Sequence, residues 1–175
     1  MPAAALISVE EYIATNYEPD ADFDNGRLIE RNLGKFKHAR LQFLIGIYIG
    51  KHESEWGILG LTEQRIRVAP KKFCVADLCA IRPDQPHQDI LEYPPLFTIE
   101  LLSEGDAFSD VEEKGRKYLN LGVPYVWTVD PESGRCYRHT AEAMLLLTDG
   151  TLRIEGSPIA IPIAELVSRL TKTEA

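Results

Sequence analysis

The spacing of apolar residues predicts a chain that alternates between helices and strands. Apolar positions recur at helical spacing within residues 37–53, which predicts a long amphipathic helix. Residues 57–69 instead alternate between apolar and polar side chains, as a half-buried strand does. Two later runs, residues 73–81 and 96–102, are almost wholly apolar, which is typical of strands that are buried on both faces.

Capping and turn signals delimit the other elements. Ser8 and Ser109 each stand three residues before a glutamate, and this capping box predicts a helix at each place, the second ending at Gly122. The other expected elements are strands at 26–31 and 123–130, two or three short strands with a hairpin at Asp149-Gly150, and a closing helix at 163–170. This order predicts an α/β (α+β) fold: one domain, residues 1–175, with a mixed central sheet about four or five strands wide, flanked by helices.

Two carboxylates interrupt the buried strands. Asp77 lies within residues 73–81, and Glu100 lies within residues 96–102. A carboxylate in a buried strand is costly unless it is ion-paired, hydrogen-bonded or bound to a metal. Two interpretations stay open: structural ion pairs, or a site for Mg²⁺, which prefers one or two carboxylates together with water and substrate phosphate.

A lysine stands on the apolar side of the helix that ends at Gly122. Lys114 continues the stripe formed by Val111 and Tyr118, so it points to where this helix packs on the sheet. Its stem could pack there while the ammonium reaches water. Alternatively, the ammonium could reach the two buried carboxylates, and such a group suits metal-assisted phosphodiester hydrolysis.

The sequence pattern also predicts positions for three further polar residues. Glu30 ends the first predicted strand, and His38 faces inward at the start of the long helix, where a hydrogen-bonded core histidine is the commoner case. Glu63 alternates with Arg65 and Arg67, so we expect it on an outer, solvated face.

The charge of the chain is negative overall but uneven. The net charge of −8 argues against a protein that coats nucleic acid. Basic residues nevertheless gather in residues 27–40, and acidic residues gather in residues 104–113. These groups are either ordinary solvated faces or a basic lip beside an acidic, metal-binding interior.

Apolar runs and cysteines bear on the class and location of the protein. The longest uncharged apolar run, residues 41–50, is too short to span a bilayer, so we expect no membrane partner. Cys74, Cys79 and Cys136 lack the number and spacing of a disulfide framework, which indicates buried thiols and a cytoplasmic protein. Because Cys74 and Cys79 are five residues apart in one strand, they should face opposite sides.

Four segments resemble, almost end to end, the Uma-two family, a bacterial family of unknown function that is described as restriction endonucleases. They read VEEYIATNYEPDADFDNGRLIERNLGKFKH, FCVADL, PPLFTIELLSEGD and EEKGRKYLNLGVPYVWTVDPE, and the likeness spans residues 8–170. The family is part of the PD-(D/E)xK nuclease superfamily. The resemblance therefore implies a restriction-endonuclease-like core, in which a four-stranded mixed sheet is flanked by helices, and also a homodimer.

The resemblance implies roles for individual residues. The family's Pro-Asp falls on Ala76-Asp77, without the proline, and its strand glutamate falls on Glu100. The superfamily's lysine would fall on Leu102, which cannot serve, and Lys114 looks like the replacement. The remaining family positions are accessory ones, at Glu30, His38 and Asp22.

Three hypotheses follow. The first is a DNA-cleaving endonuclease that depends on Mg²⁺ or Mn²⁺: Asp77 and Glu100 bind the metal, Lys114 orients water or stabilises phosphate charge, and Glu30 is an outer acid or second-metal ligand. In this hypothesis the DNA backbone is held by basic residues, namely Arg31, Lys35, Lys37 and Arg40. The second is a catalytically degenerate module that binds nucleic acid or a protein partner, which the acidic net charge favours. The third is an enzyme that acts on another phosphorylated substrate.

Overall fold

The computed structural model describes residues 6–32 and 34–172. The helices in these ranges are α1 (Val9–Ala14), α2 (Phe36–Trp56), α3 (Phe108–Leu121) and α4 (Ile163–Ser168). The strands are β1 (Asp22–Asp24), β2 (Arg27–Ile29), β3 (Leu59–Ala69), β4 (Lys72–Ile81), β5 (Ile90–Leu91), β6 (Phe97–Leu101), β7 (Tyr125–Val129), β8 (Cys136–His139), β9 (Met144–Leu147), β10 (Thr151–Arg153) and β11 (Ala160–Pro162).

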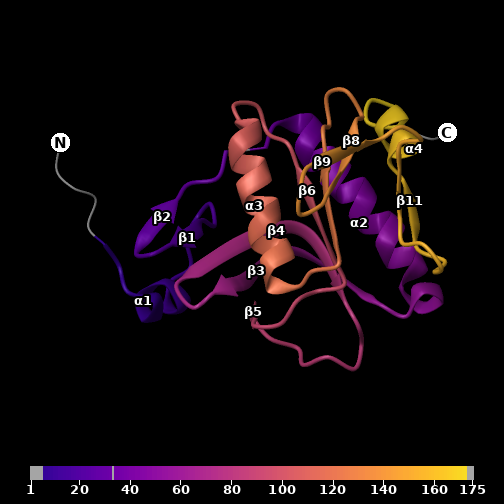
Figure 1. Ribbon diagram of the computed structural model, residues 1–175. Coiled ribbons are helices and arrows are strands. Elements are labelled where there is room, and N and C mark those ends of the chain that lie inside the picture. The colour runs from indigo at the N-terminus through magenta and orange to yellow at the C-terminus, as the bar shows by residue number, and fades with distance from the viewer. Residues whose placement is uncertain (1–5, 33, 173–175) are drawn as a thin grey trace.

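A mixed sheet forms the centre of the molecule, as the apolar pattern predicts. Its strand order is β2-β1-β4-β6-β7-β8-β9, with β3 paired to β4 and β5 paired to β3 (Figure 1). The β6–β7 and β3–β5 pairs are parallel, and the other pairs of this sheet are antiparallel. The sheet has nine strands rather than four or five, because β1 and β5 are too short to show an alternating pattern and β8 and β9 extend the far edge. Asp149 and Gly150 do not form the expected hairpin, because β10 pairs with β11 in a separate sheet.

The two apolar strands lie side by side, as expected. In the β4–β6 ladder, Leu78 lies opposite Ile99 and Ala80 lies opposite Phe97. Apart from Lys72 and Glu100, the residues of both strands are buried. The prediction that residues 73–81 and 96–102 form adjacent central strands is therefore confirmed.

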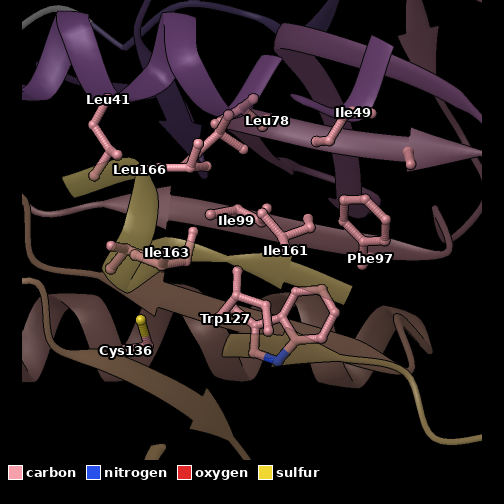
Figure 2. Close-up of a cluster of buried hydrophobic side chains, with 14 of the residues drawn as sticks. Leu41, Ile49, Leu78, Phe97, Ile99, Trp127, Cys136, Ile161, Ile163 and Leu166 are labelled. Atoms are coloured by element: carbon pink, nitrogen blue, oxygen red, sulfur yellow. The ribbon is translucent and has the colours of Figure 1, made fainter. Parts of the chain in front are cut away.

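Helices cover both faces of this sheet. On one face, α2 and α4 pack with the β10–β11 hairpin on a core that includes Leu41, Phe97 and Trp127 (Figure 2). On the other face, α3 crosses the strands (Figure 1), and Tyr118 packs in a second cluster with Val126. The mixed α/β fold class with helices on both sides is thus the one observed.

The alternation of side chains in β4 changes by one residue at Asp77. Cys74 and Cys79 both pack in the α3-side cluster, whereas Leu78 packs in the α2-side core. The expectation that the two cysteines face opposite sides is therefore wrong. The partner position in β3 is Glu63, whose φ of 49° is in the left-handed region, and the regular ladder omits this one pair.

The ends of the helices test the capping signals. Ser8 caps α1, because its Oγ accepts a hydrogen bond from the Glu11 amide at 3.0 Å. The helix predicted at Ser109 is present, but its N-cap is Ala107, two residues earlier, so Ser109 lies inside the first turn and does not cap it. α3 ends at Gly122 as expected, with a φ of 102°. No helix in the described ranges is long and apolar enough to cross a membrane.

Candidate active site

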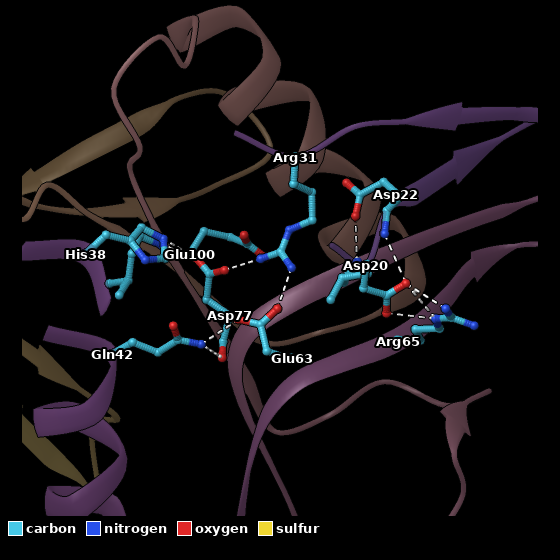
Figure 3. A network of polar contacts seen from close by, with 12 residues as sticks. Asp20, Asp22, Arg31, His38, Gln42, Glu63, Arg65, Asp77 and Glu100 are labelled. Carbon is cyan, nitrogen blue, oxygen red and sulfur yellow. Dashed lines mark hydrogen bonds and ion pairs between the residues drawn. The ribbon is translucent and has the colours of Figure 1, made fainter. Parts of the chain in front are cut away.

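Asp77 lies at the point where the alternation of β4 changes. Its side chain is only 3% exposed, and its Oδ2 accepts a hydrogen bond from the Leu101 amide at 2.7 Å, so the carboxylate pairs with the end of β6. Arg31 forms an ion pair with Oδ1, and His38 Nε2 lies 3.5 Å from Oδ2 (Figure 3). Burial alone would raise the pKa of Asp77, but the His38 hydrogen bond and the charge of Arg31 outweigh it and hold the pKa below its usual value.

Glu100 lies in β6 near Asp77. The register that pairs Leu78 with Ile99 sets Asp77 opposite Glu100 one position further along the strands. The Glu100 side chain is 12% exposed, and its Oε1 accepts a hydrogen bond from the Tyr118 hydroxyl at 2.8 Å. Burial raises the pKa of Glu100 to about 7, although the charge of Lys114 opposes this shift. Glu100 therefore holds its proton far more readily than Asp77 does.

Lys114 reaches these strands from α3. Its Nζ lies 3.0 Å from Glu100 Oε2 and 3.5 Å from Asp22 Oδ2, and it donates a hydrogen bond to the Val75 carbonyl at 2.8 Å. Asp22 is fixed in turn, because its Oδ1 accepts a hydrogen bond from the Val75 amide at 2.7 Å. Burial would lower the pKa of Lys114, but Asp22 and Glu100 raise it above its usual value, so the ammonium stays charged. Of the two arrangements open for this lysine, the ammonium points to the carboxylates and not to bulk water.

His38 and Gln42 come to the same place from the first turns of α2. A Cβ on Gly34 would lie 2.5 Å from His38 Nδ1, so only glycine leaves room for this ring. Burial would lower the pKa of His38, but its hydrogen bond to Asp77 and the charge of that carboxylate raise it overall. Gln42 Nε2 donates to the Asp77 carbonyl at 3.0 Å.

Glu63 is solvated as expected, with 48% of its side chain exposed, but it lies at this site and not on an outer face. Its Oε2 lies 2.5 Å from Arg31 Nη1, and its Oε1 accepts a hydrogen bond from Gln42 Nε2 at 2.6 Å. The alternation rule fails here because β3 changes its alternation at Glu63 itself. No signal in the sequence marks this change, so the residue was missed.

A cavity of about 570 Å³ joins these groups. The predicted residues that line it are Asp22, Glu30, Arg31, His38, Asp77, Glu100 and Lys114. Glu30 is exposed, and no ion pair or hydrogen bond of its side chain is seen among the described residues. Carboxylates thus line this cavity together with the basic side chains of Arg31, Lys114 and Lys117, of which Arg31 contacts Asp77 and Lys114 contacts Glu100.

The expected basic lip is only partly present. Lys35 pairs with Glu104, Lys37 Nζ lies 2.5 Å from Glu132, and the Arg40 guanidinium lies over the Phe43 ring, 5.6 Å from its centroid. None of these three basic side chains lines the cavity, whereas Arg31 does. The basic segment of the sequence is therefore divided between surface ion pairs and one arginine that turns inward.

The donor atoms suit a hard divalent cation. Among the described residues, no three His, Cys, Asp or Glu side chains are grouped so that they could hold an ion alone. Mg²⁺ needs no such cage, because one or two carboxylates with water and substrate phosphate suffice. Asp77 and Glu100 fit Mg²⁺ or Mn²⁺ as its protein carboxylates, and a thiolate site is excluded because Cys74 and Cys79 are buried in the apolar cluster.

A solved structure shares this fold. A crystal structure described as "a putative nuclease belonging to DUF820", from Anabaena variabilis, matches with a TM-score of 0.78 at 18% identity and covers 94% of this chain and 99% of its own. A DrdV–DNA complex covers 78% of this chain and 11% of its own, at 16% identity and a TM-score of 0.41. No curated protein matches the sequence. The model of the Uma2 family, described as "Putative restriction endonuclease", matches residues 9–159, and the chain therefore belongs to the Uma2 family.

Proposed function

We propose that this single restriction-endonuclease-like domain is a metal-dependent endonuclease that hydrolyses DNA phosphodiester bonds. The observation that carries the proposal is the convergence of Asp77, Glu100 and Lys114 in one cavity, from two adjacent strands and the helix that covers them. Membership of a family described as restriction endonucleases supports the same reaction class.

The two carboxylates have separate tasks in this proposal. Asp77 and Glu100 would hold Mg²⁺ or Mn²⁺, with a backbone carbonyl near Leu101 as a further ligand. The ion, when bound, lowers the pKa of a water molecule and offsets charge on the scissile phosphate. Asp77 is ionised at neutral pH because its pKa is lowered, whereas Glu100 must give up its proton to become a ligand, since its pKa is about 7.

Lys114 is the cation that this proposal assigns to the reacting phosphate. Its ammonium is held beside Glu100 and remains charged, so it can bind a phosphate oxygen or orient the attacking water. Asp22 would keep this ammonium in position, and Glu30 and His38 would act as accessory groups at the wall of the cavity. Lys35, Lys37 and Arg40 would contact the DNA backbone outside the cavity after exchanging their surface partners for phosphates.

A catalytically degenerate module that binds nucleic acid or a protein is the second candidate. The net charge of −8 and the ion pairs that neutralise Lys35 and Lys37 favour it, because both weaken attraction to DNA. Such a module should not need a divalent ion, and metal dependence therefore separates the two functions.

Plasmid nicking with Mn²⁺ at low salt tests the proposal. Lys114→Met keeps the packing of the stem and removes the charge, so nicking should fall by about 10²-fold or more while DNA still binds. Lys117→Met is the matched control: this lysine lies one turn further along α3 and pairs with Asp24 and Glu113 instead of Glu100. Equal losses in both variants would indicate general electrostatics, and an unchanged Lys114→Met would remove Lys114 from the mechanism.

The homodimer and the cytoplasmic location stay predictions. Sedimentation velocity of the purified chain, with and without Mn²⁺ and DNA, measures the oligomeric state directly. A monomer under all these conditions would contradict the dimer that the family resemblance implies.

A further inference from the structure

The cation nearest to Asp77 in this structure is the guanidinium of Arg31. One arm of the guanidinium pairs with Asp77 Oδ1, and Nη1 lies 2.5 Å from Glu63 Oε2, so the group bridges two carboxylates of neighbouring strands (Figure 3). Burial would lower the pKa of Arg31, but Asp77 and Glu100 raise it above its usual value, so the bridge is always charged.

Arg31 holds the oxygen of Asp77 that is not bonded to the backbone of β6. Oδ2 already accepts a hydrogen bond from the Leu101 amide of β6 at 2.7 Å and has the side-chain Nε2 of His38 from α2 at 3.5 Å. Oδ1 is thus the oxygen that a metal can take without breaking a backbone hydrogen bond, and Arg31 holds it. With 3% of the side chain exposed, Asp77 has no other open face for a new ligand.

The bridge can open without unfolding the sheet. Arg31 follows the exposed strand β2 and lies outside helix and strand, and its side chain is 19% exposed. The Glu63 side chain is 48% exposed, so solvent reaches this end of the bridge. By contrast, Lys114 is tied to Val75, Asp22 and Glu100 from inside a helix. Between Arg31, which contacts Asp77, and Lys114, which contacts Glu100, Arg31 is therefore the cation that can leave.

We propose that Arg31 is a resident counter-cation of Asp77, that a divalent metal binds Asp77 only by displacing it, and that the displaced guanidinium then holds a phosphate of the substrate. The phosphate part of this inference rests on the proposed nuclease function, whereas the exchange of cations does not. A guanidinium is suited to both tasks, because its fork of donors matches carboxylate and phosphate oxygens equally. Once it leaves Oδ1, Arg31 still lines the cavity that would hold the scissile phosphate.

Calorimetric titration with Mn²⁺ alone tests the exchange. If the metal can bind only when Arg31 has left Asp77, the apparent metal affinity equals the intrinsic affinity multiplied by the fraction of molecules in which Arg31 has left. Arg31→Met should therefore bind Mn²⁺ about tenfold more tightly than the wild type, or more, which corresponds to about 1.4 kcal/mol. Arg27→Met, which removes the same charge from exposed β2, should bind as the wild type does.

Two further variants keep the test decisive. Arg31→Lys keeps the positive charge but loses the forked guanidinium, so its Mn²⁺ affinity should lie between those of wild type and Arg31→Met. If Arg31→Met does not fold, Arg31→Lys serves as the test variant. Asp77→Asn added to either variant should abolish the gain. An Arg31 variant that binds Mn²⁺ no more tightly than wild type, or no binding by any variant, would overturn the exchange.

DNA binding in Ca²⁺ tests the second half of the inference. Ca²⁺ should tighten binding of a fluorescein-labelled duplex to wild type more than to Arg31→Met, because only wild type releases an arginine to the phosphate. An equal Ca²⁺ effect on both proteins would overturn the phosphate contact. Tighter Mn²⁺ binding by Arg31→Met without plasmid nicking by wild type would refute the nuclease proposal alone, and nicking without tighter Mn²⁺ binding would refute the exchange alone.

Discussion

The paired strands β4 and β6 contain two regions in different environments, an apolar half and a charged half. Residues 78–81 pack with Phe97 and Ile99 of β6 in apolar clusters, whereas Asp77 and Glu100 of the same two strands lie among charges. The backbone ladder of the apolar half ends at Leu78 and Ile99, the residues next to the two carboxylates. The apolar half therefore fixes the relative position of the two carboxylates, and the site needs no rigidity of its own.

The two halves differ in what offsets the free-energy cost of burying each side chain. In the apolar half, burial itself is favourable, and neighbours need only fit. In the charged half, each buried carboxylate needs a partner that offsets its charge. Asp77 has Arg31 and His38, and Glu100 has Lys114. Losing a side chain should hence create a cavity in one half and an unpaired charge in the other.

The largest expected effect is in the apolar half. Phe97→Ala removes a side chain with 0% exposure that contacts Trp127, and we expect the free energy of unfolding to fall by about 3–5 kcal/mol. Urea denaturation measures this loss. Phe36→Ala is the control, because Phe36 is 67% exposed, and it should change stability by less than about 0.5 kcal/mol. Similar losses in both variants would contradict the assignment of this core.

The next effect is in the charged half. Repulsion between two close carboxylates suggests that Asp77→Asn would stabilise the metal-free protein, but the ion pair with Arg31 reverses this expectation. We expect a loss of about 3 kcal/mol in EDTA, at the low end for breaking a buried pair, because Arg31 keeps Glu63. The rise in melting temperature with Mn²⁺ should disappear as well. The exposed Asp84→Asn should show neither change, and a Mn²⁺ shift that survives in Asp77→Asn would put the metal site elsewhere.

The sequence pattern predicts the strands of the apolar half because a strand that is buried on both faces is a continuous run of apolar residues. The adjacency of residues 73–81 and 96–102 followed from that signal, as did the long helix α2. Asp77, Glu100 and Lys114 were found as exceptions to the same pattern, and they do line one cavity.

What the sequence could not show are contacts that depend on an irregular backbone. The place of Glu63 at the site does not follow from the sequence pattern, because the alternation of β3 changes at that residue. Arg31 was assigned to a solvated basic segment, since nothing in its neighbours indicates that it alone turns inward. The short strands β1 and β5 were missed for a related reason, because pairing with longer neighbours forms them.

The smallest predicted effect contrasts a titratable group of the apolar scaffold with those of the site. His139 of β8 is 5% exposed, its Nε2 lies 2.8 Å from the Thr128 hydroxyl, and a Cβ on Gly115 would lie 2.0 Å from its Nδ1. Burial lowers the pKa of His139 from 6.5 to about 4. The unfolded chain therefore takes up this proton first as the pH falls, and stability is lost between these two values. From pH 7 to pH 5 the loss should be about 2 kcal/mol.

Protonation of Glu100 has the opposite effect on stability from protonation of His139. The pKa of Glu100 is raised to about 7, so the folded state takes up that proton first and acid stabilises the protein between about 4.5 and 7. Urea denaturation in EDTA at pH 7, 6 and 5 should consequently show a partly cancelled trend in wild type. His139→Gln should remove the unfavourable contribution, so its stability should rise relative to wild type as the pH falls, whatever its stability at pH 7. His87→Gln, at an exposed position, should run parallel to wild type. A parallel curve for His139→Gln as well would mean that His139 is not held neutral by the scaffold.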